Sequence, residues 1–373
     1  MNMKKFILVI YLMSIVISSV AQDFDFLTIS YSGEQISHEE IIESFGRDIA
    51  YSHKDNEIRV SKSVFQSEEE VFRFSAEIIK HRVIYGVIEE VELVLPSIIS
   101  TIGADAFKEC IALTSVIIPD SVTEIGEYAF GGCETLTNVV IPNSVTKIGE
   151  YAFEGCETLT NVVIPNSVTK IGNGAFNECT RLVNITIPDS VTEIGEGVFS
   201  ECEALTQVVM SNSLTEISPN TFNGCTALTN IIIPNGVSKI GEYAFYECEA
   251  LTKISIPISV NEIGEYAFSN CQGLTEVMIS GGVEKIPEEA FSNCIALTNI
   301  TISEGVKEIE GYAFANCQAL TSIRIPKSVI NVGDGAFMYN SNLKTIYVEN
   351  PTLNLMLNTL GVSFYTEIIQ CVD

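Results

Sequence analysis

The sequence predicts an α/β-type repeat solenoid, a stack of similar 23-residue coils, because three columns of residues keep one period. A phenylalanine recurs every 23 residues in eleven successive repeats, from Phe107 to Phe337. A cysteine stands three residues after the phenylalanine in ten repeats, and a leucine stands six residues after it in all eleven. A period of about 20–50 residues is typical of one supersecondary unit stacked on copies of itself.

Each repeat is expected to contain one short strand, one bend and one buried aromatic ring. Residues 136–142, Leu-Thr-Asn-Val-Val-Ile-Pro, alternate in a way that predicts a strand with one buried face. The proline ends the strand because it has no N–H group to donate. The Ile-Gly pair that follows predicts a tight bend. One coil cannot bury its own apolar face, so the phenylalanines are expected in a continuous core column.

The repeat resembles a known family. Its string Ile-Gly-Glu-Tyr-Ala-Phe-x-x-Cys-x-x-Leu-Thr-x-Val-x-Ile-Pro-x-x-Val is similar to the leucine-rich repeat of the BspA type, also called the Treponema pallidum type. The resemblance covers about residues 86–350, in about 11–12 coils of 23 residues. It implies a right-handed arc with a parallel β-sheet on its concave face. It also implies a secreted or surface protein of bacteria or some protists, several of which are adhesins or host-protein binders.

Two positions of the repeat pattern vary. The bend glycine and the strand-end proline are each replaced in three repeats, and the other columns continue through all of them, so no repeat is in doubt. The replacements are Ser218, Pro287 and Glu310 for the glycine, and Ser211, Ser280 and Ser303 for the proline.

Residues 1–21 predict a signal peptide. Lys4 and Lys5 form a basic start, residues 7–17 are apolar, and Ser19-Val20-Ala21 is a suitable cleavage signal. The alternative is an uncleaved membrane anchor, for which the apolar stretch is short. No second apolar segment follows, so we expect no membrane span after cleavage. The predicted location is outside the cytoplasm: secreted, periplasmic or on the cell surface.

Non-repeating segments flank the coils. Residues 22–85 contain two capping boxes, Ser37-x-x-Glu40 and Ser67-x-x-Glu70, each before an apolar helical face, together with strand-like runs. This composition predicts a small α/β N-terminal cap that covers the first coil, with a separate functional domain as the alternative. Residues 351–373 are expected to form a C-terminal cap, because an open end would expose the core and a strand edge.

The charge balance bears on partners. The formal net charge is −28, which argues against nucleic-acid binding through phosphate neutralisation. Acidic residues recur at two repeat positions, so like charges lie one above another in the stack. Such ladders could bind Ca²⁺ weakly between coils, and the alternative is a solvated face that keeps the protein soluble. The ladders are Glu127, Glu150, Glu196, Glu242, Glu265, Glu288 and Asp334, and Glu134, Glu157, Glu203 and Glu249.

The cysteine column favours reduced, buried thiols that act as small apolar fillers. Cysteines 23 residues apart lie about one strand spacing from each other, slightly outside the geometry that a disulfide needs. No Cys-x-x-Cys pair points to a metal site, and no motif points to another cofactor.

The strand residues between the buried ones are expected to line the concave face in two columns. One begins as an amide row, the other is rich in Val and Ile, and later coils add charge and an aromatic ring. An exposed apolar strip edged by amides is typical of a protein interface, although β-branched residues also favour strands without any partner. The predicted partner-binding residues are Asn138, Val140, Asn161, Val163, Asn184, Val209, Asn230, Ile232, Lys253, Arg324 and Tyr347.

Binding is favoured over catalysis. The sequence has no Gly-x-Ser-x-Gly, no phosphate-binding glycine loop and no histidine within the repeats. A ladder repeats its acids in every coil, whereas a glycosidase needs one pair at a set distance. The family resemblance favours adhesion to an extracellular or host protein. Two alternatives stay open: cell-surface glycan capture, for which the chain lacks Trp, and a self-associating structural protein of the envelope.

Overall fold

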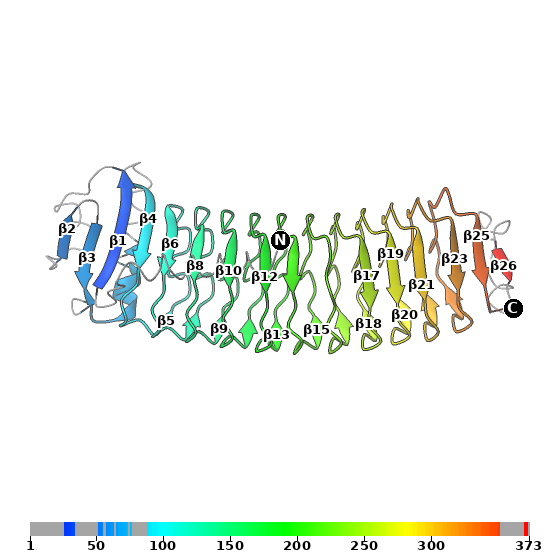
Figure 1. Ribbon diagram of the computed structural model, residues 1–373, viewed down its shortest axis with the longest axis horizontal. Coiled ribbons are helices and arrows are strands. Elements are labelled where there is room, and N and C mark those ends of the chain that lie inside the picture. The colour runs from blue at the N-terminus through cyan, green and yellow to red at the C-terminus, as the bar shows by residue number, and fades with distance from the viewer. Residues whose placement is uncertain are drawn as a thin grey trace, which may run out of the picture.

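The computed structural model describes residues 26–33, 51–54, 57–62, 65–73, 75–76, 88–350 and 369–371. These residues confirm the predicted repeat solenoid: the coils stack into one elongated body that bends gently along its length (Figure 1). The predicted signal peptide and all of the predicted C-terminal cap except residues 369–371 lie outside the described residues. Within the described part of the chain, no helix is long and apolar enough to cross a bilayer.

A broad ladder of parallel strands runs along one side of the stack, with one strand per coil in most coils. Successive strands pair in register, so Val140 lies opposite Val163 and Ser255 opposite Met278. The first part comprises β4 (Ile88–Val94), β6 (Leu113–Ile117), β8 (Asn138–Val140), β10 (Asn161–Val163), β12 (Asn184–Thr186) and β14 (Gln207–Val209). Two three-stranded sheets follow: β17 (Lys253–Ile256), β19 (Glu276–Ile279) and β21 (Asn299–Ile302), then β23 (Ser322–Ile325), β25 (Thr345–Val348) and β26 (Ile369–Cys371).

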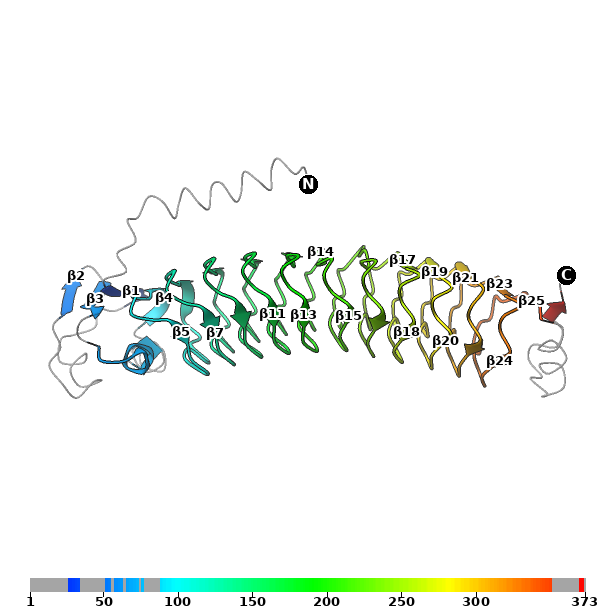
Figure 2. The ribbon, with the colours of Figure 1, turned by 90° about the horizontal axis from the view of Figure 1, so that it is seen from below.

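A narrow ladder of two-residue strands runs along the opposite side (Figure 2). Its bend residue donates its N–H to the preceding coil, as from Gly126 to Ile102 O (2.8 Å). The strands form three sheets. They are β5 (Thr101–Ile102), β7 (Glu124–Ile125), β9 (Lys147–Ile148), β11 (Lys170–Ile171) and β13 (Glu193–Ile194); β15 (Glu216–Ile217), β16 (Lys239–Ile240) and β18 (Glu262–Ile263); and β20 (Lys285–Ile286), β22 (Glu308–Ile309) and β24 (Asn331–Val332).

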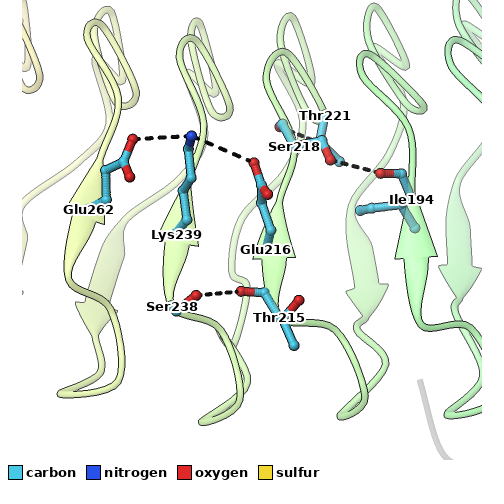
Figure 3. A network of polar contacts seen from close by, with 8 residues as sticks. All are labelled: Ile194, Thr215, Glu216, Ser218, Thr221, Ser238, Lys239 and Glu262. Atoms are coloured by element: carbon cyan, nitrogen blue, oxygen red, sulfur yellow. Dashed lines mark hydrogen bonds and ion pairs between the residues drawn. The ribbon is translucent and has the colours of Figure 1, made fainter.

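The two interruptions of the narrow ladder coincide with two replacements of the bend glycine. At the first, the Ser218 hydroxyl, rather than a backbone N–H, donates to Ile194 O (2.7 Å; Figure 3). At the second, Pro287 has no N–H to donate. Glu310, the third replacement, keeps this bond, from its N–H to Ile286 O (2.9 Å), and the ladder continues there. The departures therefore keep the coils but divide the sheet.

Ion pairs between exposed side chains also cross the narrow ladder, and the sequence analysis did not identify them. Lys239 Nζ lies 3.1 Å from Glu262 and 4.0 Å from Glu216 (Figure 3), and the hydrogen bond with Glu262 raises the pKa of Lys239. Exposed pairs of this kind contribute at most about 1 kcal/mol each. The other pairs of this row are Lys147–Glu124 (2.6 Å), Lys170–Glu193 (2.6 Å) and Lys285–Glu310 (3.0 Å).

The third side of each coil consists of turns, so the stack has less helix than an α/β-type solenoid suggests. In the described part of the chain, α-helix is confined to residues 68–73 and 75–76. In all eleven coils the residues two before and two after the phenylalanine have positive φ, as at Tyr128 (50°) and Glu178 (58°). Such left-handed residues stop a helix from propagating. Backbone bonds still join the coils here, for example Phe107 N–H to Ala129 O (2.8 Å).

The predicted phenylalanine column is the centre of the core. Each ring stacks on the next from Phe107 to Phe337, with ring centroids 5.1–5.9 Å apart. The rings up to Phe314 are fully buried. Phe72, from the helical segment, closes the N-terminal end of the column with an edge contact to Phe107 (5.6 Å, 88°).

The N-terminal strands extend the broad ladder beyond the first coil. β1 (Phe26–Gly33) pairs antiparallel with both β4 and β3 (Glu57–Ser61), and β2 (Tyr51–Lys54) pairs with β3 at the edge. Of the predicted capping boxes, the one at residues 67–70 is described: Ser67 Oγ accepts the N–H of Glu70 (3.3 Å). The other, at residues 37–40, lies outside the described residues. These strands and the helical segment therefore cover the first coil, as an α/β cap would.

The cysteine column is buried and all ten of its thiols are free, as predicted. The thiols are also donors, which the sequence analysis did not identify. Each thiol from Cys133 to Cys317 donates to the carbonyl oxygen of the phenylalanine one coil earlier, at 3.1–3.4 Å. In the last coil Asn340 takes the cysteine's place, and its Nδ2 donates to Phe314 O (2.9 Å). The column thus supplies hydrogen bonds as well as volume.

Removing one ring from the stack should be costly. We expect Phe222→Ala to lower the free energy of unfolding by about 3–5 kcal/mol, because the fully buried ring leaves a cavity between two neighbours. Tyr339→Ala, at a ring that is 71% exposed, should change it by less than about 0.5 kcal/mol. Urea unfolding followed by circular dichroism measures both, and equal effects would contradict the role of the column.

The buried thiols should make the fold sensitive to alkali. Burial raises the pKa of the Cys271 and Cys317 thiols to about 12 and raises that of other thiols in the column. In the unfolded chain a thiol ionises near pH 8.5. The folded state therefore favours the neutral thiol, and its contribution to stability is complete below about pH 8.5 and lost as the pH rises toward about 12.

We accordingly expect the urea midpoint to fall steeply above about pH 9. In Cys271→Ser, which lacks one of these ionisable thiols, the slope should be shallower by roughly one proton. Native thiols should resist alkylation at neutral pH. A midpoint independent of pH, or rapid labelling of the folded protein, would be evidence against buried neutral thiols.

Candidate functional site

The predicted partner-binding residues all lie on the outward face of the broad ladder. The apolar column is open to solvent and becomes more exposed toward the middle of the stack. Its exposed fractions are 36% at Val140, 55% at Val163, 58% at Val209 and 76% at Ile232. These side chains therefore lie outside the core.

The amide column runs beside it, with adjacent strands in register. Asn138, Asn161 and Asn184 are half-buried, and Gln207 and Asn230 are exposed. Over six successive coils no outward strand position carries a charge, in a chain with 48 acidic and 20 basic residues. We call these positions the uncharged strip: Ser115, Ile117, Asn138, Val140, Asn161, Val163, Asn184, Thr186, Gln207, Val209, Asn230 and Ile232.

Charged side chains begin where the strip ends, and they pair with one another. Lys253 Nζ lies 2.6 Å from Glu276, and Arg324 pairs with Glu349. Tyr347 is half-buried opposite Arg324 on β25. The three predicted site residues of this half, Lys253, Arg324 and Tyr347, are therefore accessible, but both cations already have a carboxylate partner.

Two adjoining hollows flank Ile232. One, of about 420 Å³, lies between β14 and the coil of Ile232, and the other, of about 400 Å³, lies between that coil and β17. The broad ladder is interrupted here: a single bridge joins Gln207 to Asn230, and regular pairing resumes only at β17. The most exposed apolar residue of the strip therefore stands between two depressions in its surface.

The sequence analysis did not identify these hollows, although it contained a signal for them. The coil before Ile232 has Ser211 at the strand end, where most coils have proline, and Ser218-Pro219 at the bend. Ser211 Oγ donates to Val191 O (2.7 Å), two turns back in the preceding coil. The hollows thus lie next to the coil that departs from the repeat at both variable positions.

Rows of unlike chemistry border the strip. The turn that leads into the strands carries the exposed carboxylates of Glu134, Glu157, Glu203 and Glu249, and the turn that follows them carries Asn143, Asn166, Asn212 and Asn235. One long edge of the strip is therefore acidic and the other is mainly amide. Among the residues that the structure describes, no three acidic, thiol or imidazole groups converge as metal ligands. Weak Ca²⁺ binding at the acidic ladders stays a prediction.

Comparison with known proteins decides the family. A family model described as the BspA type leucine-rich repeat region matches residues 77–204, 146–275 and 261–364. The chain belongs to the BspA-type leucine-rich repeat proteins. No curated protein sequence matches this BspA-type protein.

Several solved structures are similar to this BspA-type protein. A leucine-rich repeat protein from Bacteroides ovatus is 25% identical with a TM-score of 0.48, and the match covers 76% of this chain and 96% of that one. A leucine rich cell surface protein from Faecalibacterium prausnitzii is 31% identical with a TM-score of 0.42, covering 70% and 91%. The T. pallidum leucine-rich repeat protein is 28% identical with a TM-score of 0.40, covering 50% and 83%.

Neighbouring residues on opposite faces of the ladder should differ sharply in their effect on stability. Ile231 is 5% exposed and Ile232 is 76% exposed. We expect Ile231→Ser to lower the free energy of unfolding by about 3 kcal/mol or more. Ile232→Ser should change it by less than about 0.5 kcal/mol. Urea unfolding of both variants tests this, and a large loss in Ile232→Ser would mean that the side chain stabilises the coil.

Proposed function

We propose that this BspA-type protein is exported, stays at the cell surface or is secreted, and binds an extracellular or host protein through the uncharged strip. Its role is adhesion rather than catalysis. The observation that carries the proposal is the absence of charge over six coils of an outward face, in a chain with a net charge of −28. A soluble surface normally mixes charges, and an exposed apolar patch rimmed by polar groups is typical of an interaction site.

Two further observations support a binding role. The strip lies on a rigid ladder whose strands are held in register, so its side chains are already positioned for a partner. The F. prausnitzii relative, 31% identical, is described as a cell surface protein, and the predicted signal peptide of this chain points to export as well.

A pull-down from extracellular-matrix and serum proteins with the full chain tests the proposal. We expect a partner that the wild type retains and that Val140→Asp/Val163→Asp loses, because two carboxylates would have to be buried in the interface. The matched control is Ile330→Asp/Tyr339→Asp, which adds the same charge at exposed apolar residues off the strip (63% and 71% exposed). Circular dichroism confirms that all three proteins are folded.

Other outcomes would redirect the proposal. Equal loss in both variants would mean that added charge alone weakens binding, and no loss in either would move the site off the strip. If no protein is retained, glycan capture and self-association become the readings to test, by glycan array and by sedimentation at high concentration.

A further inference from the structure

We propose that the strongest part of this interface is the pair of hollows around Ile232, and that its occupant is an amphipathic α-helix of a partner protein. The helix lies along the stack, across the strands, with its apolar stripe on Val209, Ile232 and Met278. Basic residues on one flank face Glu203 and Glu249. This inference rests on the proposed function and names the partner's chemistry.

The spacing of the coils favours a helix. Strands of a ladder lie about 4.8 Å apart, and the core rings of the three coils concerned lie 5.8 Å and 5.4 Å apart (Phe199–Phe222 and Phe222–Phe245). One turn of an α-helix rises about 5.4 Å, so its apolar side chains meet the coils one by one. In an extended chain, side chains on one face are about 6.6–6.8 Å apart. They would lose step with the coils after one or two repeats.

The shape of the surface supplies separate seats for successive side chains. The hollows share Ile231 and Ile232, so each is one coil from the other. Ile232 forms the ridge between them, and Met278, 44% exposed, lies in the wall of the second. Each volume, about 400 Å³, is open to solvent. A ridge between two depressions at the spacing of one helical turn fits side chains at positions i and i+3 or i+4 of a helix.

The charges define the polar flanks of that helix. The floor of the first hollow carries amides and apolar groups, with Gln207 and Asn230 beside Val209. Glu203 and Glu249 stand exposed along one edge, whereas Asn212 and Asn235 stand along the other. Because the whole chain is strongly acidic, a helix with lysine or arginine on its acidic-facing flank gains both steering and a fixed direction.

The test uses synthetic peptides as probes against the full chain. The first is an amphipathic helix of about 18 residues, five turns, with leucines in a helical stripe and lysines on one flank. The second has the same composition with leucine and lysine alternating, as in an extended strand. The third keeps the helical stripe and replaces lysine with glutamate. Fluorescence anisotropy gives each affinity, and circular dichroism reports whether helix forms on binding.

We expect saturable binding of the first peptide alone, with helix formation. Ile232→Asp should weaken it roughly tenfold or more, as substitution at the centre of an interface does. Ile330→Asp, which adds the same charge at a residue 63% exposed elsewhere, should leave it within about twofold. Glu203→Gln/Glu249→Gln should weaken binding and reduce its dependence on salt.

Three results would overturn the inference: no saturable binding, tighter binding of the alternating peptide, or equal effects of Ile232→Asp and Ile330→Asp. Its failure is separable from that of the proposed function. A natural partner that is lost in Val140→Asp/Val163→Asp but not displaced by the helical peptide would leave the strip as the interface and remove the helix as its occupant.

Discussion

Register between coils is the constraint on which this protein depends. Each coil bonds to the next on three sides, through the broad ladder, the narrow ladder and the turns around the phenylalanine. All three sets of bonds hold together only if every coil has the same length, because one extra residue would move the following side chains to the wrong face. The strict spacing of 23 residues is the trace of this requirement in the sequence.

Within that register, what is preserved at a position is a hydrogen-bond donor more than a residue type. The carbonyl of each buried phenylalanine needs a donor, and cysteine supplies it in the interior coils while Asn340 does so in the last. At the bend, glycine and Glu310 donate through the backbone and Ser218 donates through its hydroxyl. Only Pro287 has no N–H for this bond, and the narrow ladder is divided at that coil.

This difference explains what the sequence could and could not predict. Columns set by burial, such as Phe222, Cys225 and Leu228, repeat without exception across the interior coils, so the stack, its core and its outward face were predictable. The left-handed residues beside each phenylalanine were not, because that position accepts Gly, Asn, Glu and Tyr alike. Ion pairs such as Lys239–Glu262 and the hollows beside Ile232 arise between coils, from how two departures from the pattern meet in space. A periodic alignment of one coil on another does not display such meetings.

The same division separates structure from function in this molecule. Register and burial prescribe the inward residues of each strand and leave the outward ones unconstrained, as the contrast between Ile231 and Ile232 illustrates. Solubility would favour charge at unconstrained positions of so acidic a chain, and the later coils do carry it, at Lys253 and Glu276. The six coils before them do not. Because folding does not require that absence, and the strip is most exposed where the ladder opens around Ile232, the composition of this face is best explained by what it binds.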